Sequence, residues 1–350
     1  MDYELMQKFG LQKEEIKVYE KLVENNYLTL NEHDTKESDI ARKLFEKGLI
    51  IKKLNKIYLK PADKLFEILL KRIYPNKKMT TEFKFRSKYQ QIVLKRFADE
   101  IFLFLNNSPQ VCSLDEEEFH EYIATLPALL AKNLRRVVIL GGGDGLALRN
   151  ILKFKEVKKV ILVEIDKDMI KLAKYNSLMQ KLNNNSFSDP RVELVIGDAF
   201  KWLINSDLKF DVIINDCEET FTDQPEGIEQ AYGDFYKSMF DKLTDGGIAT
   251  FNSSNDEEEM EVFNEFLKKH LKYILPENII NKINSKQKLY EKDFIVQKHF
   301  FKNIKIACVN SAFVGNHTNF YISNQPIKKQ RDAPRTTRFI DFNKLKDNID

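Results

Sequence analysis

The segment RRVVILGGGDG, residues 135–145, decides the fold of the larger part of this chain. Its first half is a run of aliphatic and β-branched residues without polar alternation, which is typical of a strand buried on both faces of a sheet. Its second half is rich in glycine, so the backbone can approach a ligand closely and open the N-terminus of a helix. The segment therefore predicts a strand, a ligand-binding turn and a helix.

Four further strands of the same kind follow, each separated from the next by a helical pattern. They are KKVILVEID (158–166), RVELVIGDA (191–199), FDVIINDC (210–217) and GGIATFNSS (246–254). Alternating strands and helices predict an α/β domain with a doubly wound, mostly parallel sheet. Ligands of such a sheet bind outside the carboxyl ends of its strands.

Acidic residues stand at successive strand ends, beside the glycine turn that contains Gly141 and Gly143. Glu164 ends the second strand, about twenty residues after the turn, where an acid suits the two hydroxyls of a ribose. Asp198 follows the third strand and could accept a hydrogen bond from an adenine amino group. Asp216 ends the fourth. A single acid of this kind is often only a helix cap, but the series of them predicts a nucleoside site.

Asp144, within the glycine turn, indicates which nucleoside is bound. A fixed carboxylate would repel the methionine carboxylate of S-adenosylmethionine and would attract an ammonium group. Decarboxylated S-adenosylmethionine carries an aminopropyl ammonium and has no carboxylate there, so the turn suits it better. The alternative is that Asp144 caps the following helix and points away from the site.

Composition bounds the remaining possibilities. The 350 residues predict about two domains, and 43% of them are hydrophobic, which is enough for a packed core. The 56 basic and 53 acidic residues leave a net charge of only +3, so nothing favours a nucleic-acid binder. No apolar run approaches the ~20 residues of a membrane span, and the three cysteines form no metal-binding or disulfide pattern. We expect a cytoplasmic protein without a bound metal.

The remainder of the chain divides into smaller parts. Residues 1–75 read as helix, helix and hairpin, and they resemble the winged-helix domain of archaeal transcriptional regulators. Residues 76–82 read as a linker and 83–118 as a small antiparallel sheet. The Rossmann-like domain is expected over 119–325, with a helical insertion at 256–303, before a tail at 326–350.

The middle of the chain resembles the polyamine aminopropyltransferases, the spermidine synthase family. The resemblance rests on eight segments matched in order over residues 87–253, which are SKYQQI, QVCSLDEEEFHE, LPALL, VVILGGGDG, VILVEIDKDMI, DPRVELVIGDAF, FDVIINDC and GDFYKSM…LTDGGI. It implies a small N-terminal β-region, a methyltransferase-like domain and a homo-oligomer. The implied reaction moves the aminopropyl group of decarboxylated S-adenosylmethionine to a di- or polyamine, with no tightly bound cofactor.

The resemblance also implies residue roles. Gln90, Glu164, Asp198 and Ala199 would hold the methylthioadenosine part of the donor, beside the turn glycines. Asp144 would hold the aminopropyl ammonium and Asp216 would be the general base that deprotonates the amine. The amine pocket would be lined by His120, Glu219 and Asp223.

The acceptor half departs from the family pattern. The loop after Asp216 lacks the family's Asp-Pro pair, and Glu219 stands where a second Asp is usual unless Asp223 is its equivalent. Phe119 replaces a tyrosine before His120. Two other functions therefore stay open: a non-catalytic polyamine or nucleoside sensor with a winged-helix output, and a class I methyltransferase. DNA binding by residues 1–75 is the minor alternative, since that part holds 15 basic and 13 acidic residues.

Overall fold

In the computed structural model of the chain, internal contacts divide the protein into two units. Unit 1 comprises residues 1–117 and 310–316, and unit 2 comprises 118–309 and 317–350. The structure describes residues 6–7, 9–25, 27–29, 35–53, 56–60, 62–217, 228–254, 304–311, 315–323, 327 and 329–340. The predicted helical insertion at 256–303 lies outside these ranges.

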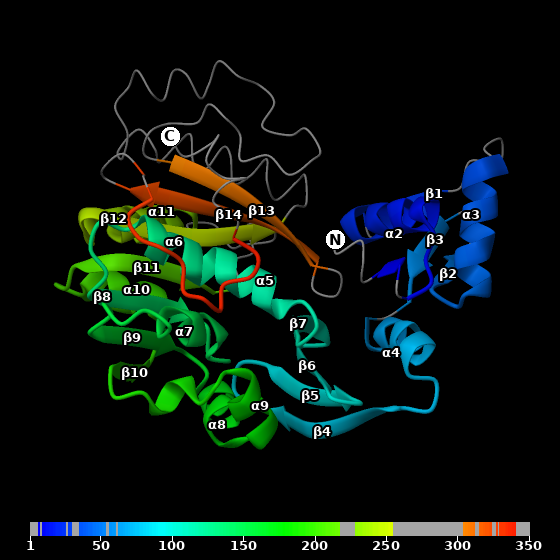
Figure 1. The fold of residues 1–350 in the computed structure, drawn as a ribbon, viewed down its shortest axis with the longest axis horizontal. Coiled ribbons are helices and arrows are strands. Elements are labelled where there is room, and N and C mark those ends of the chain that lie inside the picture. The colour runs from blue at the N-terminus through cyan, green and yellow to red at the C-terminus, as the bar shows by residue number, and fades with distance from the viewer. Residues whose placement is uncertain are drawn as a thin grey trace, which may run out of the picture. The chain divides into compact units, whose positions relative to one another are not determined.

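Unit 1 begins with helices and a three-stranded antiparallel sheet in the order β1-β3-β2 (Figure 1). Its elements are α2 (Lys13–Asn25), β1 (Leu28–Thr29), α3 (Thr35–Glu46), β2 (Ile50–Lys53), β3 (Lys56–Leu59) and α4 (Ala62–Ile73). The helices and the hairpin expected from the sequence are present among the described residues. The assignment of this part as a winged helix stays a prediction.

A four-stranded antiparallel sheet in the order β4-β5-β6-β7 completes unit 1. Its strands are β4 (Met79–Arg86), β5 (Gln91–Phe97), β6 (Glu100–Leu105) and β7 (Ser108–Cys112). Residues 79–82, predicted as part of a linker, instead lie in β4. The polar residues that suggested a linker fit an edge strand, which pairs on one side only and faces solvent at most positions.

The two parts of unit 1 share one core. Phe66 of α4 stacks against Phe102 of β6, with ring centroids 5.7 Å apart. Met6, Tyr19 and Phe97 belong to the same buried cluster and are each at most 1% exposed. The regions 1–75 and 83–118, predicted from the sequence as separate parts, therefore pack together.

Unit 2 is built on a seven-stranded sheet in the order β10-β9-β8-β11-β12-β14-β13 (Figure 1). The strands are β8 (Arg136–Gly141), β9 (Lys159–Glu164), β10 (Val192–Ile196), β11 (Phe210–Asp216), β12 (Leu243–Ser254), β13 (Ile304–Ser311) and β14 (Gly315–Ser323). β8 to β12 pair in parallel, and β14 pairs antiparallel with β12. The predicted doubly wound, methyltransferase-like α/β fold is confirmed.

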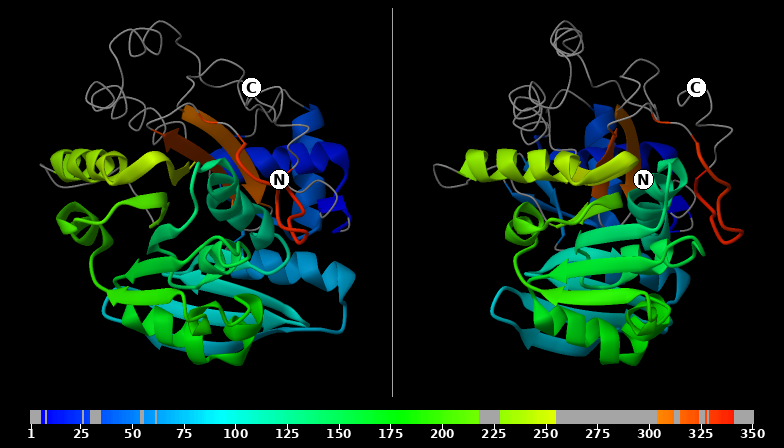
Figure 2. Two further views of the ribbon diagram at one scale, coloured as in Figure 1. Left: turned by 60° about the vertical axis from the view of Figure 1, so that its left-hand side comes forward. Right: turned by 90° about the vertical axis from the view of Figure 1, so that its left-hand side faces the viewer.

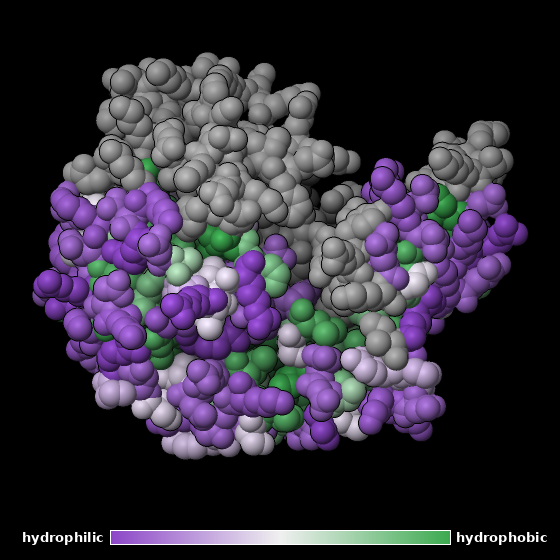
Figure 3. All heavy atoms as spheres, in the orientation of Figure 1, coloured by the Kyte–Doolittle hydropathy of each residue, from purple (hydrophilic) through white to green (hydrophobic). Residues whose placement is uncertain are grey.

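Helices lie on both sides of this sheet (Figure 2). They are α5 (Glu116–His120), the π-helix η1 (Glu121–Thr125), α6 (Leu126–Leu130), α7 (Leu146–Ile151), α8 (Lys167–Tyr175), α9 (Ser177–Leu182), the 3₁₀-helix η2 (Ser186–Ser188), α10 (Ala199–Asn205) and α11 (Ile228–Asp241). Val137 to Leu140 of β8 are completely buried. On the face drawn in Figure 3, the described residues around β8–β10 are mainly hydrophilic.

The direction in which successive strands are added to the sheet reverses between β8 and β11. β8 is the first strand of unit 2, and its neighbours are β9, which follows it in the chain, and β11, which starts the other half. The connections from β8 therefore run in opposite directions along the sheet. Such a switch point opens a crevice at the carboxyl ends of the strands, beside β8 and β11.

A buried carboxylate joins three strands at the opposite, amino end of the sheet. Asp211 of β11 is 5% exposed and accepts hydrogen bonds from the backbone N–H groups of Arg135 (2.7 Å) and Arg136 (3.0 Å). It also accepts one from the Thr244 hydroxyl of β12 at 2.7 Å. The side chain thus fixes the starts of β8 and β12 on β11.

We expect Asp211→Ala to lower the free energy of unfolding by about 3 kcal/mol, because it removes three hydrogen bonds that a buried carboxylate accepts. Urea unfolding of the two proteins measures this difference. Asp207→Asn, on an exposed residue, is the matched control and should change stability by less than about 0.5 kcal/mol. Equal stability of Asp211→Ala and the wild type would contradict the assignment.

Candidate active site at the carboxyl end of the sheet

The glycine turn is pressed against the end of β11. Gly141 and Gly142 have φ angles of 77° and 66°, which L side chains rarely adopt. A Cβ at Gly141 would lie 2.5 Å from the carbonyl oxygen of Asp216, and one at Gly142 would lie 2.9 Å from its carboxylate Oδ2. Glycine is therefore required here for the close approach of Asp216 as well as for the turn.

On its other side, the same turn contacts the Glu164 carboxylate through Gly143. The Gly143 N–H donates to Glu164 Oε2 at 3.1 Å, and a Cβ at Gly143 would lie 2.7 Å from that oxygen. The other oxygen of Glu164 accepts the Asp166 N–H at 2.8 Å. Burial raises the pKa of Glu164, and the charges of Asp166 and Asp144 raise it further.

Asp144 makes a hydrogen bond at the start of α7 and also lies near two other carboxylates. Its Oδ1 accepts the N–H of Leu146 at 2.8 Å, so it does cap the first turn of α7. It nevertheless lies close enough to Glu164 and Asp216 for its charge to raise the pKa of both. Capping therefore does not remove Asp144 from the predicted site.

Asp216 is the last residue of β11 and pairs in register with Gly141. Burial raises its pKa to about 7, with the charges of Asp144 and Glu164 acting in the same direction and that of His120 opposing them. A carboxylate with a pKa near neutrality can hold or release a proton at physiological pH, which is what a general base needs. Three other predicted site residues, Asp144, Glu164 and His120, are thus near enough to Asp216 for their charges to act on its pKa.

His120 ends α5 immediately before the π-helix η1. It is 3% exposed, and the Phe119 ring meets it edge to face with centroids 5.1 Å apart. A charge on His120 lowers the pKa of Asp216, so the two side chains lie within electrostatic range of each other.

Asp198 begins α10 at the neighbouring strand end. Its Oδ1 accepts the N–H groups of Phe200 (3.0 Å) and Lys201 (3.1 Å), so it is a helix cap as well as a candidate ligand-binding residue. Gly197 beside it donates its N–H to the Glu164 carbonyl at 3.0 Å, which joins this turn to the end of β9. Ala199 follows and is buried.

Two apolar side chains near this turn were not found from the sequence. Ile165 is 40% exposed and Ile196 is 52% exposed, although each is adjacent to a buried strand. Ile196 is in register with Glu164, and Ile165 follows Glu164 in the chain. Exposed isoleucines beside the ribose-type acid offer an apolar surface for a base. The sequence signal was available, since both residues directly follow or end a strand that leads into a predicted ligand residue.

Three further predicted site residues stay predictions. Gln90 lies in unit 1, before β5, where its carbonyl accepts the Ser87 N–H at 2.9 Å. Glu219 and Asp223 lie outside the described residues. In the described ranges, no cluster of three or more His, Cys, Asp and Glu side chains could hold a metal ion. No helix among those ranges is long and apolar enough to span a bilayer.

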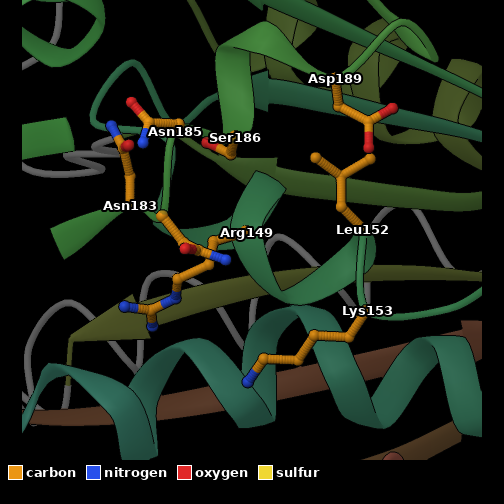
Figure 4. A pocket seen from close by; sticks show the side chains of 8 residues that line it. Arg149, Leu152, Lys153, Asn183, Asn185, Ser186 and Asp189 are labelled. Atoms are coloured by element: carbon orange, nitrogen blue, oxygen red, sulfur yellow. The ribbon is translucent and has the colours of Figure 1, made fainter. Parts of the chain in front are cut away.

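A separate pocket lies against the glycine turn, with a volume of about 300 Å³ (Figure 4). Asn183 and Ser186 line it and also support the turn, since the Asn183 amide donates to the Asp144 carbonyl and the Ser186 hydroxyl donates to the Gly145 carbonyl, both at 3.0 Å. None of the carboxylates Asp144, Glu164 or Asp216 lines this pocket. It is therefore distinct from the carboxylate cluster.

Comparison with known families matches residues 116–283 to the spermine/spermidine synthase domain. The chain is 36% identical to polyamine aminopropyltransferase 2 of Aquifex aeolicus over 183 residues, which are 52% of this chain and 36% of that protein. It is 36% identical to the polyamine aminopropyltransferase of Thermococcus onnurineus over 170 residues, 47% of this chain and 57% of that one. The chain thus spans only a third to just over half of the length of these curated relatives.

Solved structures confirm the fold. The spermidine synthase from Thermotoga maritima matches with a TM-score of 0.53 at 21% identity, covering 76% of this chain and 77% of that one. A spermidine synthase in complex with the transition state analogue AdoDATO matches with a TM-score of 0.54 at 21% identity, covering 78% and 88%.

We expect Asp216→Asn to be more stable than the wild type at pH 8, by about 4 kcal/mol, since a pKa raised from 3.8 to about 7 costs about 1.4 kcal/mol for each pH unit. The pKa of Asp216 is raised in the folded protein, so its ionisation costs stability as the pH rises from about 4 to about 7. The gap should close as the pH falls toward 4. Urea unfolding across this pH range measures it, and a variant less stable than the wild type at every pH would contradict the raised pKa.

Proposed function

We propose that this chain, in which residues 116–283 carry a spermine/spermidine synthase domain, transfers the aminopropyl group of decarboxylated S-adenosylmethionine to a di- or polyamine. The observation that carries the proposal is the cluster of Asp144, Glu164 and Asp216 around one glycine turn. Burial and the charges of neighbouring carboxylates raise the pKa values of Glu164 and Asp216, so a cationic ligand would stabilise their ionised forms. Both the donor, a sulfonium with an ammonium group, and the amine acceptor are cations.

The donor is discriminated by charge at Asp144. Its carboxylate is held by the Leu146 N–H at the start of α7, so it cannot move freely away from an incoming group. An ammonium at that place is attracted and a carboxylate is repelled. The ribose hydroxyls would bind Glu164, and the base would lie near Asp198, Ala199, Ile165 and Ile196. The resemblance to the aminopropyltransferases adds Gln90 to the residues expected to bind the donor.

Asp216 supports the chemical step. An aliphatic amine is mostly protonated at neutral pH and cannot attack until it loses a proton. Asp216, with a pKa of about 7, accepts that proton as the amine nitrogen attacks the propyl carbon attached to sulfur. The carbon–sulfur bond breaks, its electron pair neutralises the sulfonium, and methylthioadenosine leaves.

The acceptor is selected by the remaining parts of the site. His120 lines the amine pocket beside Asp216 in this proposal, together with Glu219 and Asp223 from the loop that follows Asp216. Extra carboxylates in that loop favour a longer or more highly charged polyamine. A homo-oligomeric assembly and a cytoplasmic location are further parts of the proposal, tested by light scattering and cell fractionation.

We expect an assay with decarboxylated S-adenosylmethionine and a panel of di- and polyamines to yield methylthioadenosine and an amine heavier by one aminopropyl group. Mass spectrometry identifies both products. Asp216→Asn should lower kcat at least about 100-fold, since general base catalysis typically contributes 10²–10⁴-fold, whereas Asp207→Asn should match the wild type. Binding of methylthioadenosine without product from any amine would overturn the enzyme and favour the sensor.

We expect decarboxylated S-adenosylmethionine to raise the melting temperature well above the shift given by S-adenosylmethionine at equal concentration, because tighter binding to the folded state stabilises it more. Asp144→Asn should narrow the difference between the two ligands. Differential scanning fluorimetry measures both effects. A larger shift with S-adenosylmethionine would instead support a methyltransferase.

A further inference from the structure

Glu121, the residue after His120, is a fully buried carboxylate that binds a distant part of the chain. It is 0% exposed and begins the π-helix η1. Its two oxygens accept the Arg338 N–H at 2.8 and 3.1 Å, and Oε2 also accepts the Phe339 N–H at 2.8 Å. A side chain at position 121 thus satisfies the backbone of residues 338–339.

Those two residues belong to a segment that runs along the same helical stretch. We call residues 329–340 the C-terminal strap; it is drawn in red beside α5 and α6 in Figures 1 and 2. The Gln330 N–H donates to the Leu129 carbonyl at 2.9 Å, and the Arg331 guanidinium donates to the Ala128 carbonyl. The strap is therefore tied to α6 at one end and to η1 at the other.

The hydrogen bonds of Glu121 to the strap lie at the start of the π-turn that follows His120. The carbonyl of Glu121 accepts the N–H of Leu126, five residues later, which is the hydrogen bond that defines a π-turn. Burying a carboxylate is costly unless hydrogen bonds replace its water, and here the strap supplies three. Glu121 is held on both its side chain and its carbonyl, so the direction in which the preceding residue enters the turn is fixed as well.

We propose that Glu121 is a positioning residue that, through the C-terminal strap, holds His120 beside Asp216 in the amine pocket. This inference rests on the proposed aminopropyl transfer for its functional part. His120 is buried at the cluster, and its charge acts on Asp216 against those of Asp144 and Glu164. A shift of the turn would change that contact while leaving the donor side, built on the ends of β8, β9 and β10, in place.

The test uses Glu121→Gln in the full chain, with Glu193→Gln, on the exposed β10 edge, as the control of equal charge change. A glutamine has one acceptor oxygen, and its NH₂ group cannot accept the strap N–H groups. We expect hydrogen exchange at the amides of residues 338 and 339 to speed up at least about tenfold, matching the loss of one hydrogen bond to a charged group. The control should leave it unchanged.

Enzyme kinetics show whether Glu121 positions His120 or only anchors the C-terminal strap. We expect Glu121→Gln to raise the amine KM about tenfold with the donor KM unchanged within twofold. The acid limb of the kcat/KM profile should move to higher pH, as in His120→Asn, because the group that lowers the pKa of Asp216 has moved. Faster exchange with an unchanged amine KM and pH profile would overturn the proposal and leave Glu121 as an anchor only.

Failure of the proposed function gives a different pattern. If the wild type forms no product from any amine, the aminopropyl transfer itself is wrong. The positioning role is then decided by NMR of the His120 ring, assigned among the five histidines by its loss in His120→Asn. Ring signals that move in Glu121→Gln but not in Glu193→Gln support the role, and ring signals that stay in place overturn it.

Discussion

The structure of the site depends on bringing three carboxylates to one glycine turn. Asp144, Glu164 and Asp216 come from different parts of the sequence, and the parallel sheet collects them because the carboxyl ends of β8, β9 and β11 share one edge. The turn can lie between Glu164 and Asp216 only without side chains, since a Cβ there would collide with one or the other. Burial, together with the charges of the neighbouring carboxylates, raises the pKa values of Glu164 and Asp216, so this place favours cations.

Much of this arrangement could be predicted from the sequence, for a definite reason. Strand order in a doubly wound sheet follows from the alternation of strands and helices, so residues at strand ends, such as Glu164 and Asp216, can be placed without coordinates. The dual role of Asp144 could not be decided in that way, because capping and ligand binding use the same residue type at the same position. The pKa of Asp216 depends on distances that only the fold sets.

Contacts between distant segments account for what the sequence did not show. Glu121 binds a backbone 217 residues later, and no local pattern marks that pairing. Phe66 and Phe102 join two regions predicted as separate parts, because periodicity shows that a face is apolar but not which face covers it. Residues 79–82 of β4 read as part of a linker, since an edge strand keeps the polar composition of a loop. The residues of the glycine turn and the strand ends could be predicted because their pattern is local in the sequence. Contacts between distant segments leave no local pattern and could not be predicted.

The central claim is that the carboxylates Asp144, Glu164 and Asp216, at the carboxyl end of the sheet, form a binding site for a cation. Its most direct test is an NMR titration of the side-chain carboxyl carbons, with Asp216 assigned through Asp216→Asn, in the free protein and with decarboxylated S-adenosylmethionine. The account predicts an Asp216 pKa of about 7 in the free protein, which falls when the cationic ligand binds. An Asp216 carboxyl that titrates in the usual acidic range and does not respond to the ligand would contradict it.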